Sequence, residues 1–493
     1  MMEHSGSEWL DLLWFVAALG AMAVFLAALL KVRVPAAGSA RLLARAGLIA
    51  AGVMATIVAN VILYKHDAHL DFTREHAFTP SPDVQRVVRE LTSEVDLTYF
   101  YQRNNPNAVG AKTILETLGR SNPLLKVRTV DPDQNPGMAN RMGMKIYNAA
   151  VITAGDKRLE VVSTDDREIA LGIVRITRND NRPICFGSGQ GEYDIDNFEF
   201  HTHFEGSGGH QHGQETTLVN VEQHGLGRLR RALEKLGYSV RKVELARVGA
   251  VPEDCAALVE GNPRYRFAPP DIAKLKAYLG QGGNLLLLIE PDYPVDGPLA
   301  ELLASMGVAV EDGVLVDPKS HYFTDEQMVA ISAYPTHPAT INLGLSFFPG
   351  ARPLRVVAAD GVKTSAFLST SEQSYAKTPA GQNLNKPAVH TLGISAQGLL
   401  NGQGPRPFRF AMVGDADFAS NSFFPYLANS DLALGLIAWL RGEERGPAMK
   451  PSTEVLPTVA LTEGQMRNIF ILTVLVLPGL AALLGIFMWW RRR

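Results

Sequence analysis

Three uncharged apolar stretches lie at the two ends of this chain and constrain its architecture more than any other feature. Residues 12–30, 46–64 and 469–490 contain no charged side chain, and each has about the 20 residues that a helix needs to cross a bilayer. A buried helix of a soluble core is the alternative, but three such stretches at the chain ends favour membrane spans. The sequence therefore predicts three transmembrane helices that anchor a large region between them.

Basic residues predict how these helices are oriented. Lys31, Arg33, Arg41 and Arg45 lie between the first two stretches, and Arg491–Arg493 follow the third. Because positively charged loops stay in the cytoplasm, we expect the N-terminus and the region from 65 to 468 to lie outside and the C-terminus to lie inside. The first eight residues are acidic, so the first stretch does not read as a cleaved signal peptide.

Composition excludes some classes of protein. The net charge of −3 provides no basic field for nucleic acid. Two cysteines, Cys185 and Cys255, are too few for a disulfide framework and do not have the spacing of a zinc site. A single bridge between them in an oxidising compartment and two buried thiols both remain open.

The region between the membrane stretches alternates strand-like and helix-like segments, which is typical of α/β domains. The apolar run at 284–291 is what a central parallel strand requires, whereas 320–405 predicts a β-rich insertion. We expect a doubly wound, flavodoxin- or amidotransferase-like domain and a smaller α/β domain. The predicted divisions are two spans with a cytoplasmic loop (1–65), the first α/β domain (66–180), the second α/β domain with insertions (181–440), a linker (441–468) and the last span (469–493).

A glycine-rich turn, Gly187-Ser-Gly-Gln-Gly-Glu192, follows the first predicted strand of the second domain. It departs from the dinucleotide pattern GxGxxG because Glu192 stands at the third glycine, where a carboxylate would repel a pyrophosphate. The sequence also has no P-loop, so we expect no ATP hydrolysis by this chain and no cofactor.

Polar residues at the ends of two predicted strands are the candidates for ligand binding, since open α/β sheets bind ligands at the carboxyl ends of their strands. Asp415 or Asp417 could instead cap the following helix or accept hydrogen bonds from the amides of the turn. An enzyme that uses Cys185, Ser188 or Asp415 is a further alternative, although Ser188 lacks the GxSxG context and Cys185 falls inside a strand. The candidates are Gly187, Ser188, Gly189, Gln190, Glu192, Asp415, Asp417 and Asn421.

A histidine-rich segment follows the glycine-rich turn. Paired imidazoles, together with Glu205, could bind a metal ion, but the many glycines of the segment favour a solvated insertion. The candidate ligands are His201, His203, His210 and His212.

Ordered motifs from residue 70 to the C-terminus resemble the GldG-like auxiliary components of ABC transporters. They lie at 70–91, 127–139, 187–194, 236–245, 278–292 and 410–423, and the closing apolar stretch resembles the last span of that family. The turn departs from the G-H-G-E pattern of the family because Gln190 replaces the histidine, and the first apolar stretch is additional.

The resemblance implies a non-enzymatic auxiliary subunit in the bacterial inner membrane, with its main domain in the periplasm. Its partners would be an ABC permease and a separate ATPase, and it would present a ligand- or partner-binding domain. Two other functions stay open at this point: an envelope hydrolase or amidotransferase-like enzyme, and a structural partner of envelope or motility machinery.

Overall fold

The computed structural model describes residues 79–144, 146–199 and 225–443, together with Met449 and short helical pieces near both termini. The chain divides into two compact units, Met1–Thr79 and Pro80–Arg493. The predicted domain divisions are finer than this and stay a prediction.

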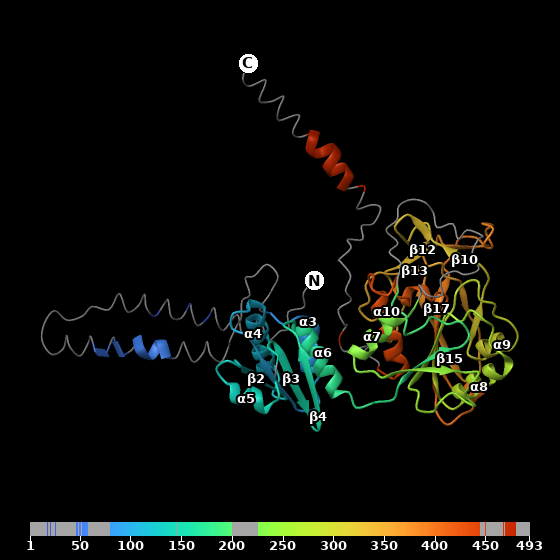
Figure 1. The fold of residues 1–493 in the computed structure, drawn as a ribbon. Coiled ribbons are helices and arrows are strands. Elements are labelled where there is room, and N and C mark those ends of the chain that lie inside the picture. Colours follow the sequence, from blue (N-terminus) through green and yellow to red (C-terminus); the bar gives the residue numbers. More distant parts are fainter. Residues whose placement is uncertain are drawn as a thin grey trace, which may run out of the picture. The chain divides into compact units, whose positions relative to one another are not determined.

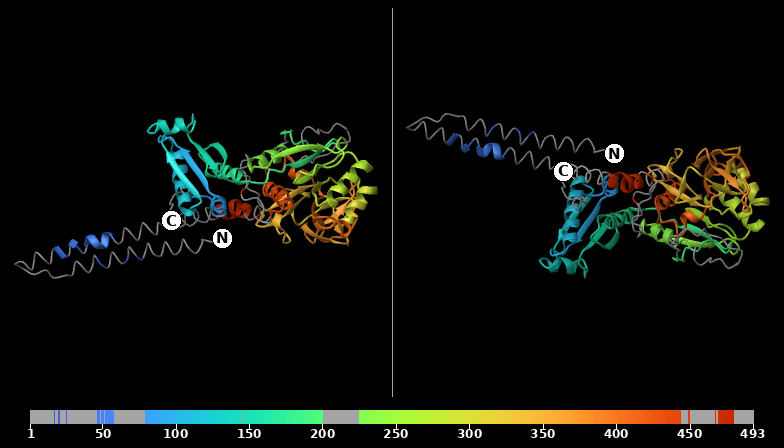
Figure 2. Two further views of the ribbon diagram at one scale, coloured as in Figure 1. Left: turned by 90° about the horizontal axis from the view of Figure 1, so that it is seen from below. Right: turned by 90° about the horizontal axis from the view of Figure 1, so that it is seen from above.

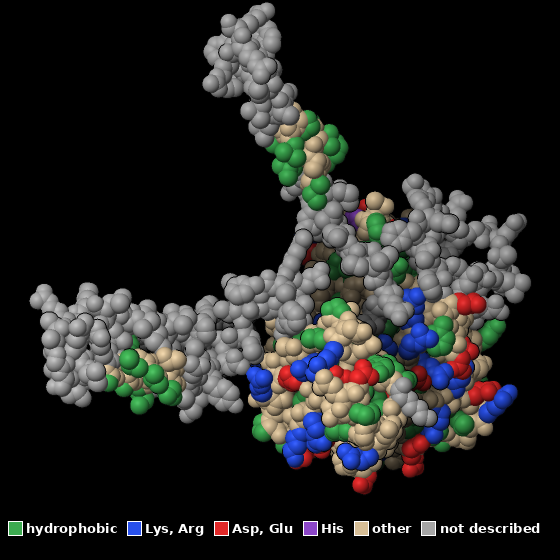
Figure 3. Space-filling model, turned by 60° about the vertical axis from the view of Figure 1, so that its left-hand side comes forward, with side chains coloured by type: hydrophobic (Ala, Val, Ile, Leu, Met, Phe, Trp, Pro, Cys, Tyr) green, Lys and Arg blue, Asp and Glu red, His purple; other side chains and the backbone are tan. Residues whose placement is uncertain are grey.

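The helical pieces near the termini display apolar side chains. In the first unit, Ile49, Val53, Met54 and Ile57 are more than half exposed. Near the C-terminus, apolar residues between 469 and 477 are also exposed on a helix that includes one π-helical stretch, Ile471–Val476 (Figure 3). No helix in the described part of the chain combines the length and the apolar character that a membrane crossing requires. Most of the three predicted spans lies outside the described residues.

Residues from Pro82 to Thr177 build a small four-stranded sheet (Figure 1). The strands follow the order β2-β1-β3-β4, in which β1 and β2 are parallel and the other neighbours are antiparallel. The elements are α3 (Pro82–Arg89), β1 (Val95–Phe100), α4 (Pro106–Ser121), β2 (Leu125–Val130), α5 (Pro136–Arg141), β3 (Ala149–Ala154), β4 (Lys157–Val162) and α6 (Asp166–Thr177).

Local sequence explains where the helices of the small sheet begin. The Asn105 side chain accepts hydrogen bonds from the amides of Asn107 and Ala108, with Pro106 at the first helical position of α4. Asp165 caps α6 in the same way, through the amide of Arg167. Apolar residues of α3, α4 and α6 pack together with alternate residues of β1, while α5 contributes to a separate cluster with Phe100.

The main sheet begins at β5 and has a parallel core. Five neighbouring strands, β6-β5-β7-β8-β18, run parallel, and antiparallel strands β17, β14 and β9 extend this order. Numbered along the chain, the parallel core has the order 2-1-3-4-5 of flavodoxin-like sheets. Its strands are β5 (Ile184–Ser188), β6 (Val240–Glu244), β7 (Ala257–Gly261), β8 (Asn284–Leu288) and β18 (Phe408–Val413).

Helices cover both faces of this core, which Figure 2 shows from two opposite sides. Residues of α7 (Gly227–Lys235) and α10 (Asn429–Leu440) pack with Phe186, Val259 and Leu286, whereas α8 (Pro269–Gly280) and α9 (Gly297–Ser305) pack with Leu258, Leu287 and others. Because β8 is buried on both faces, it reads as the continuous apolar run seen in the sequence. The mixed α/β fold predicted from the sequence is confirmed.

The predicted β-rich insertion consists of short strands and turns. It contains a three-stranded sheet β11-β12-β13 and a two-stranded sheet β10-β16, while β15 pairs with β17 of the main sheet. The bounds are β9 (Val308–Val310), β10 (Val314–Val316), β11 (His321–Tyr322), β12 (Asp325–Ile331), η2 (Pro338–Thr340), β13 (Ser346–Pro349), β14 (Leu354–Val356), β15 (Val362–Ser369), β16 (Tyr375–Lys377), β17 (Thr391–Gly398) and η3 (Leu400–Gly402).

The two cysteines form a disulfide bond. Cys185 of β5 is joined to Cys255, which lies just before the neighbouring strand β7, with 5.6 Å between their Cα atoms. Both cysteines are buried. Of the two states that the sequence leaves open, the structure therefore has the bridge.

Candidate functional site

The predicted ligand-binding residues lie at the carboxyl edge of the parallel core, but not on neighbouring strands. Gly187 and Ser188 end β5, whereas Asp415 and Asp417 follow β18, and β7 and β8 lie between them. Residues 189–199, here called the strap, span this distance. The Tyr193 amide donates to the carbonyl of Gly261 after β7 at 2.9 Å, and its hydroxyl donates to Asp417 at 2.6 Å.

Asn421 holds the far end of the strap. Its side-chain amide donates to the carbonyls of Asn197 at 2.6 Å and Glu199 at 2.9 Å, and its oxygen accepts from the amide of Arg228. Tyr193 and Ile195 of the strap are buried. The chain itself thus covers the predicted rim, and it brings the turn after β5 together with the turn after β18.

Close packing and backbone conformation both require glycine in this turn. A Cβ at Gly187 would overlap the carboxyl group of Glu260 on the neighbouring strand. Gly189 and Gly191 have φ angles of +100° and +79°, which side chains other than glycine rarely adopt. Between them, the carbonyl of Gln190 accepts from two backbone amides, those of Arg264 and Tyr265. This part of the rim is a tight turn packed against the end of β7.

A pair of carboxyl groups lies behind this turn. Glu260 is fully buried; neither of its carboxyl oxygens accepts from an N–H or hydroxyl group, and its carboxyl group is hydrogen-bonded to that of Glu192. Burial and the nearby Glu192 raise the pKa of Glu260 well above its ordinary value, and burial also raises the pKa of Glu192. Glu192 accepts from the amide of Gln190 at 2.7 Å, which favours its charged form. We therefore assign the proton of the pair to Glu260.

A second acidic group lies where β8 and β18 end. Glu290 accepts from the amides of Ala416 at 2.7 Å and Asp417 at 3.2 Å. The buried Asp415 accepts from the amide of Phe418 at 2.8 Å, next to the short helix η4 (Asp417–Ala419). Burial is the main cause that raises the pKa of both Glu290 and Asp415 well above their ordinary values. Asp415 therefore caps a turn, as the alternative interpretation of the sequence proposed.

The buried Arg352 donates hydrogen bonds to backbone carbonyls that lie next to this edge. Its guanidinium donates to the carbonyls of Tyr293 at 2.7 Å, Glu311 at 3.2 Å and Glu290 at 3.3 Å. Its backbone amide donates to the carbonyl of Gly414, the residue directly before Asp415. Nothing in the sequence marked Arg352, because it lies within the insertion and far along the chain from the residues it contacts.

Polar atoms without a protein donor or acceptor concentrate at this edge. Among the described residues, most of the buried side-chain nitrogen and oxygen atoms of this kind belong to the edge or to Arg352 beneath it. Buried polar atoms in native proteins are rarely left without partners, so this concentration marks the edge as unusual. The unmatched atoms at this edge are both oxygens of Glu260 (apart from the bond to Glu192), both amide atoms of Asn262, Arg352 Nε, Asp415 Oδ2 and Ser420 Oγ.

The predicted metal ligands His201, His203, His210 and His212 lie outside the described residues, so the metal hypothesis stays a prediction. Within the described ranges, no group of three or more His, Cys, Asp or Glu side chains is arranged to hold a metal ion.

Cysteine catalysis is not compatible with the structure. The Cys185 sulfur is part of the disulfide bond and is buried, so it cannot act as a nucleophile. The enzyme alternative was therefore wrong in its use of this residue.

A buried Ser374–His390–Asn385 arrangement in the insertion escaped the sequence reasoning. Asn385 Oδ1 accepts from the amide of Ala376, so its Nδ2 is the donor to His390 Nε2 at 2.8 Å. His390 Nδ1 must then carry the proton and donate to Ser374 Oγ at 2.9 Å. A histidine that donates to serine cannot activate it as a base, and Ser374 is fully buried. The arrangement joins three segments of the insertion, at Ser374, Asn385 and His390, by hydrogen bonds.

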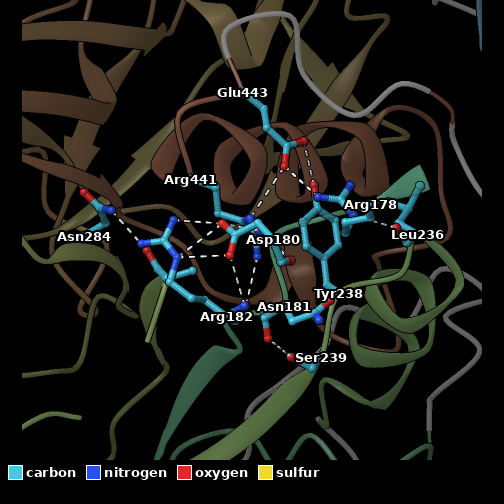
Figure 4. A network of polar contacts seen from close by, with 11 residues as sticks. Arg178, Asp180, Asn181, Arg182, Leu236, Tyr238, Ser239, Asn284, Arg441 and Glu443 are labelled. Carbon is cyan, nitrogen blue, oxygen red and sulfur yellow. Dashed lines mark hydrogen bonds and ion pairs between the residues drawn. The ribbon is translucent and has the colours of Figure 1, made fainter. Parts of the chain in front are cut away.

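A second polar network joins the connector between the two sheets, Arg178–Arg182, to the end of α10 (Figure 4). Glu443 binds Arg178 and accepts from the Tyr238 hydroxyl, both at 2.8 Å. The Tyr238 ring contacts the guanidinium groups of both Arg178 and Arg441, at 3.7 and 4.8 Å from its centroid.

Arg441 completes this network on the connector side. Its side chain is 2% exposed and binds Asp180 at 2.9 Å, and it donates to the carbonyl of Arg182 at 3.0 Å. Hydrogen bonds from Arg182 are the largest cause that lowers the pKa of Asp180 to about 2. A cavity of about 400 Å³ adjoins these residues and is lined also by α3 and α6. The network ties the connector between the two sheets to the end of α10.

Solved structures similar to this chain share little sequence with it. The mmIFT52 N-terminal domain is 14% identical, with a TM-score of 0.36, and the match covers 52% of this chain and 96% of that one. A putative ThuA-like protein from Bacteroides uniformis is 13% identical, with a TM-score of 0.30, over 53% of this chain and 93% of that one. No curated protein matches the chain.

One family model covers more than half of the sequence. It is described as an ABC-type uncharacterized transport system, and it matches residues 181–444. The matched segment contains the main sheet, the strap, the insertion and the site at the carboxyl edge. The chain belongs to this family of ABC-type transport system proteins.

Proposed function

We propose that this chain is a non-enzymatic auxiliary subunit of an ABC transport system, anchored in the bacterial inner membrane with its α/β body in the periplasm. The family match over 181–444 carries the proposal. The GldG-like motifs point in the same direction, and the lack of a P-loop means that another chain must supply ATP hydrolysis. An ABC permease and a separate ATPase are therefore its proposed partners.

Two structural observations support this placement. A buried disulfide bond is typical of proteins that fold in an oxidising compartment such as the periplasm. The helical pieces near both termini expose apolar side chains, which suits a lipid environment. In this arrangement, the carboxyl edge of the main sheet is the surface offered to a ligand or partner.

Protease protection in spheroplasts tests the proposed orientation. Protease added from outside should digest the region 80–443 and leave a tag at the C-terminus attached to a protected fragment. Digestion of the C-terminal tag with the body intact would contradict the orientation. An ATPase assay on the purified chain should show no hydrolysis, and activity that survives removal of co-purifying ATPases would contradict the division of roles.

A further inference from the structure

We propose that the strap is a removable cover, and that the polar groups beneath it form a binding site for a small organic cation with N–H donors. This inference deepens the proposed function, because it specifies where the periplasmic body binds a ligand and what charge the ligand has. It depends on the geometry of the strap, on the polar groups beneath it and on their charge.

The strap has the construction of a hinged segment. It begins at Gly189 and Gly191, whose positive φ angles confine the change of direction to a short turn. Beyond the turn, no residue of the strap belongs to a helix or to a strand of the sheet. Tyr193 and Ile195 are its buried apolar anchors.

Individual polar contacts attach the strap to the body, rather than a continuous ladder of backbone hydrogen bonds. Besides the bonds of Tyr193 and Asn421, the carbonyls of Asp194 and Asn197 accept from two amides at the start of α7. The exposed Lys242 pairs with Asp194 at 2.5 Å and with Asp196 at 2.6 Å. Exposed ion pairs contribute about 1 kcal/mol or less. Beyond the turn, where the Gln190 carbonyl accepts two amides, the two hydrogen bonds of Tyr193 attach the strap to the ends of β7 and β18.

The groups beneath the strap have unused hydrogen-bonding capacity in the closed arrangement. Asn262 and Asp415 are each fully buried, and each has at least one polar atom to which no donor or acceptor is matched, while Glu260 beside them bonds only to Glu192. They lie at the ends of β7 and β18, and the strap reaches both strand ends through the two hydrogen bonds of Tyr193. A ligand that enters when the strap moves can supply the missing donors and acceptors, which offsets the free-energy cost of releasing Tyr193.

The charge of the edge selects a cation. Five carboxyl groups lie along this edge. Of the two arginines beside them, Arg264 pairs with Asp292 at 3.6 Å, and Arg352 donates to backbone carbonyls from its two terminal nitrogens, with only Nε left unmatched. An anion would face the charged carboxylate of Glu192, whereas an amine can donate both to that carboxylate and to the unmatched oxygen of Asp415. Because no described group of three side chains suits a metal ion, an organic cation fits better than a metal. The carboxyl groups are Glu192, Glu260, Glu290, Asp415 and Asp417.

Carboxyl footprinting of the full chain in mild detergent tests the removable cover. A carbodiimide with an amine-bearing label modifies accessible carboxyl groups, and peptide mass spectrometry reads the rate at Glu260 and Asp415. We expect both to be labelled faster than the protein unfolds globally. Tyr193→Phe removes the hydrogen bond to Asp417. A typical hydrogen bond changes an opening equilibrium by about a factor of two to ten, so the labelling rate should rise by that factor.

A matched variant controls for a general loss of stability. Tyr334→Phe removes the hydroxyl of a half-buried tyrosine in the insertion. This hydroxyl lies within hydrogen-bond distance of the carbonyls of Ile331 and Gly344 and accepts from the amide of Ser346, and its loss should leave labelling of Glu260 and Asp415 unchanged. Labelling that follows only global unfolding, in the wild type and in Tyr193→Phe alike, would show that the strap is a permanent part of the fold.

Putrescine and succinate, which have four-carbon chains and opposite charges, test the ligand class. Putrescine should slow labelling of Glu260 and Asp415 in a saturable manner, and succinate should have no effect at equal ionic strength. Equal protection by both compounds, or by neither, would overturn the organic cation. This result is independent of whether a permease is recovered with the chain, so failure of the site and failure of the proposed function can be distinguished.

Discussion

Glu260 places its buried carboxyl group against the Cα atom of Gly187, in the space that a side chain at Gly187 would fill. The contact joins neighbouring parallel strands at the point where the chain order of the sheet reverses. Gly187 resembles part of a phosphate-binding loop in sequence. In the structure its role is different, because the lack of a side chain makes room for the Glu260 carboxyl group.

Gly187→Ala should therefore destabilise the protein by about 1–3 kcal/mol, the usual cost of overpacking a core position. Gly249→Ala is the matched control, because nothing lies within 4 Å of its added Cβ, and it should change the free energy of unfolding by less than about 0.5 kcal/mol. Denaturant titrations in detergent measure both. Equal stability of the two variants would mean that the Glu260 carboxyl does not occupy this space.

Stability should fall as pH rises, because Glu260 keeps its proton in the folded state. Its folded pKa lies well above the unfolded value of 4.5, so between these two values the folded state binds more protons than the unfolded state. Linkage then requires the free energy of unfolding to decrease as pH rises through this window. Glu290 and Asp415 act in the same direction.

Glu260→Gln should flatten this pH dependence in part, since the amide does not titrate. Thermal midpoints measured at several pH values above 4.5 should decline less in the variant than in the wild type. Glu253→Gln, at an exposed position, should leave the wild-type slope in place. A steeper decline in Glu260→Gln than in the wild type would contradict the buried proton.

The disulfide bond should contribute about 2–4 kcal/mol to stability, mainly by restricting the unfolded chain. It closes a separation of 70 residues between Cys185 and Cys255. The double variant Cys185→Ala/Cys255→Ala should be less stable by that amount, and the unfolded wild type should resist alkylation until a reductant is added. Alkylation of both thiols without reductant would show that the bridge is absent and would weaken the periplasmic placement.

Arg441→Ala should be costly, because Arg441 is the most buried cation of its network and pairs with both Asp180 and Glu443. Asp180 and Glu443 are 38% and 30% exposed and keep Arg182 and Arg178 as partners, so the cost should be about 1–3 kcal/mol, above the roughly 1 kcal/mol or less of exposed pairs. Arg355→Ala, which breaks an exposed pair with Glu311, is the control. Limited trypsin digestion should also cut the connector after Arg178 or Arg182 faster in Arg441→Ala; equal rates in both variants would contradict a role for Arg441 in holding the connector.

Local sequence patterns predicted much of the fold. The β8 strand and helix α8, with prolines at its start and glycines after its end, follow from hydrophobicity and helix-end signals alone. Helix α10 was not predicted. Eleven of its twelve residues are buried, so it lacks the polar face that gives an amphipathic helix its period.

The candidate site was predictable only in part. The turn at Gly187–Glu192 and the aspartates after β18 stand out because they follow strands. Glu260, Asn262 and Arg352 do not, since their importance comes from contacts across the sheet that no sequence spacing encodes. Glu260 lies in an apolar run where a buried acid has no local signature, and only pairing with β5 places it beside Gly187 and Glu192.

The most direct test of the auxiliary role is affinity purification of the tagged full-length chain from its native membranes in mild detergent, followed by mass spectrometry. A matched sample with a tagged, unrelated inner-membrane protein gives the background. The account predicts that a multi-span permease and a soluble ATPase are enriched together with this chain in fixed proportion. Recovery of neither protein above background, from membranes that contain both, would contradict it.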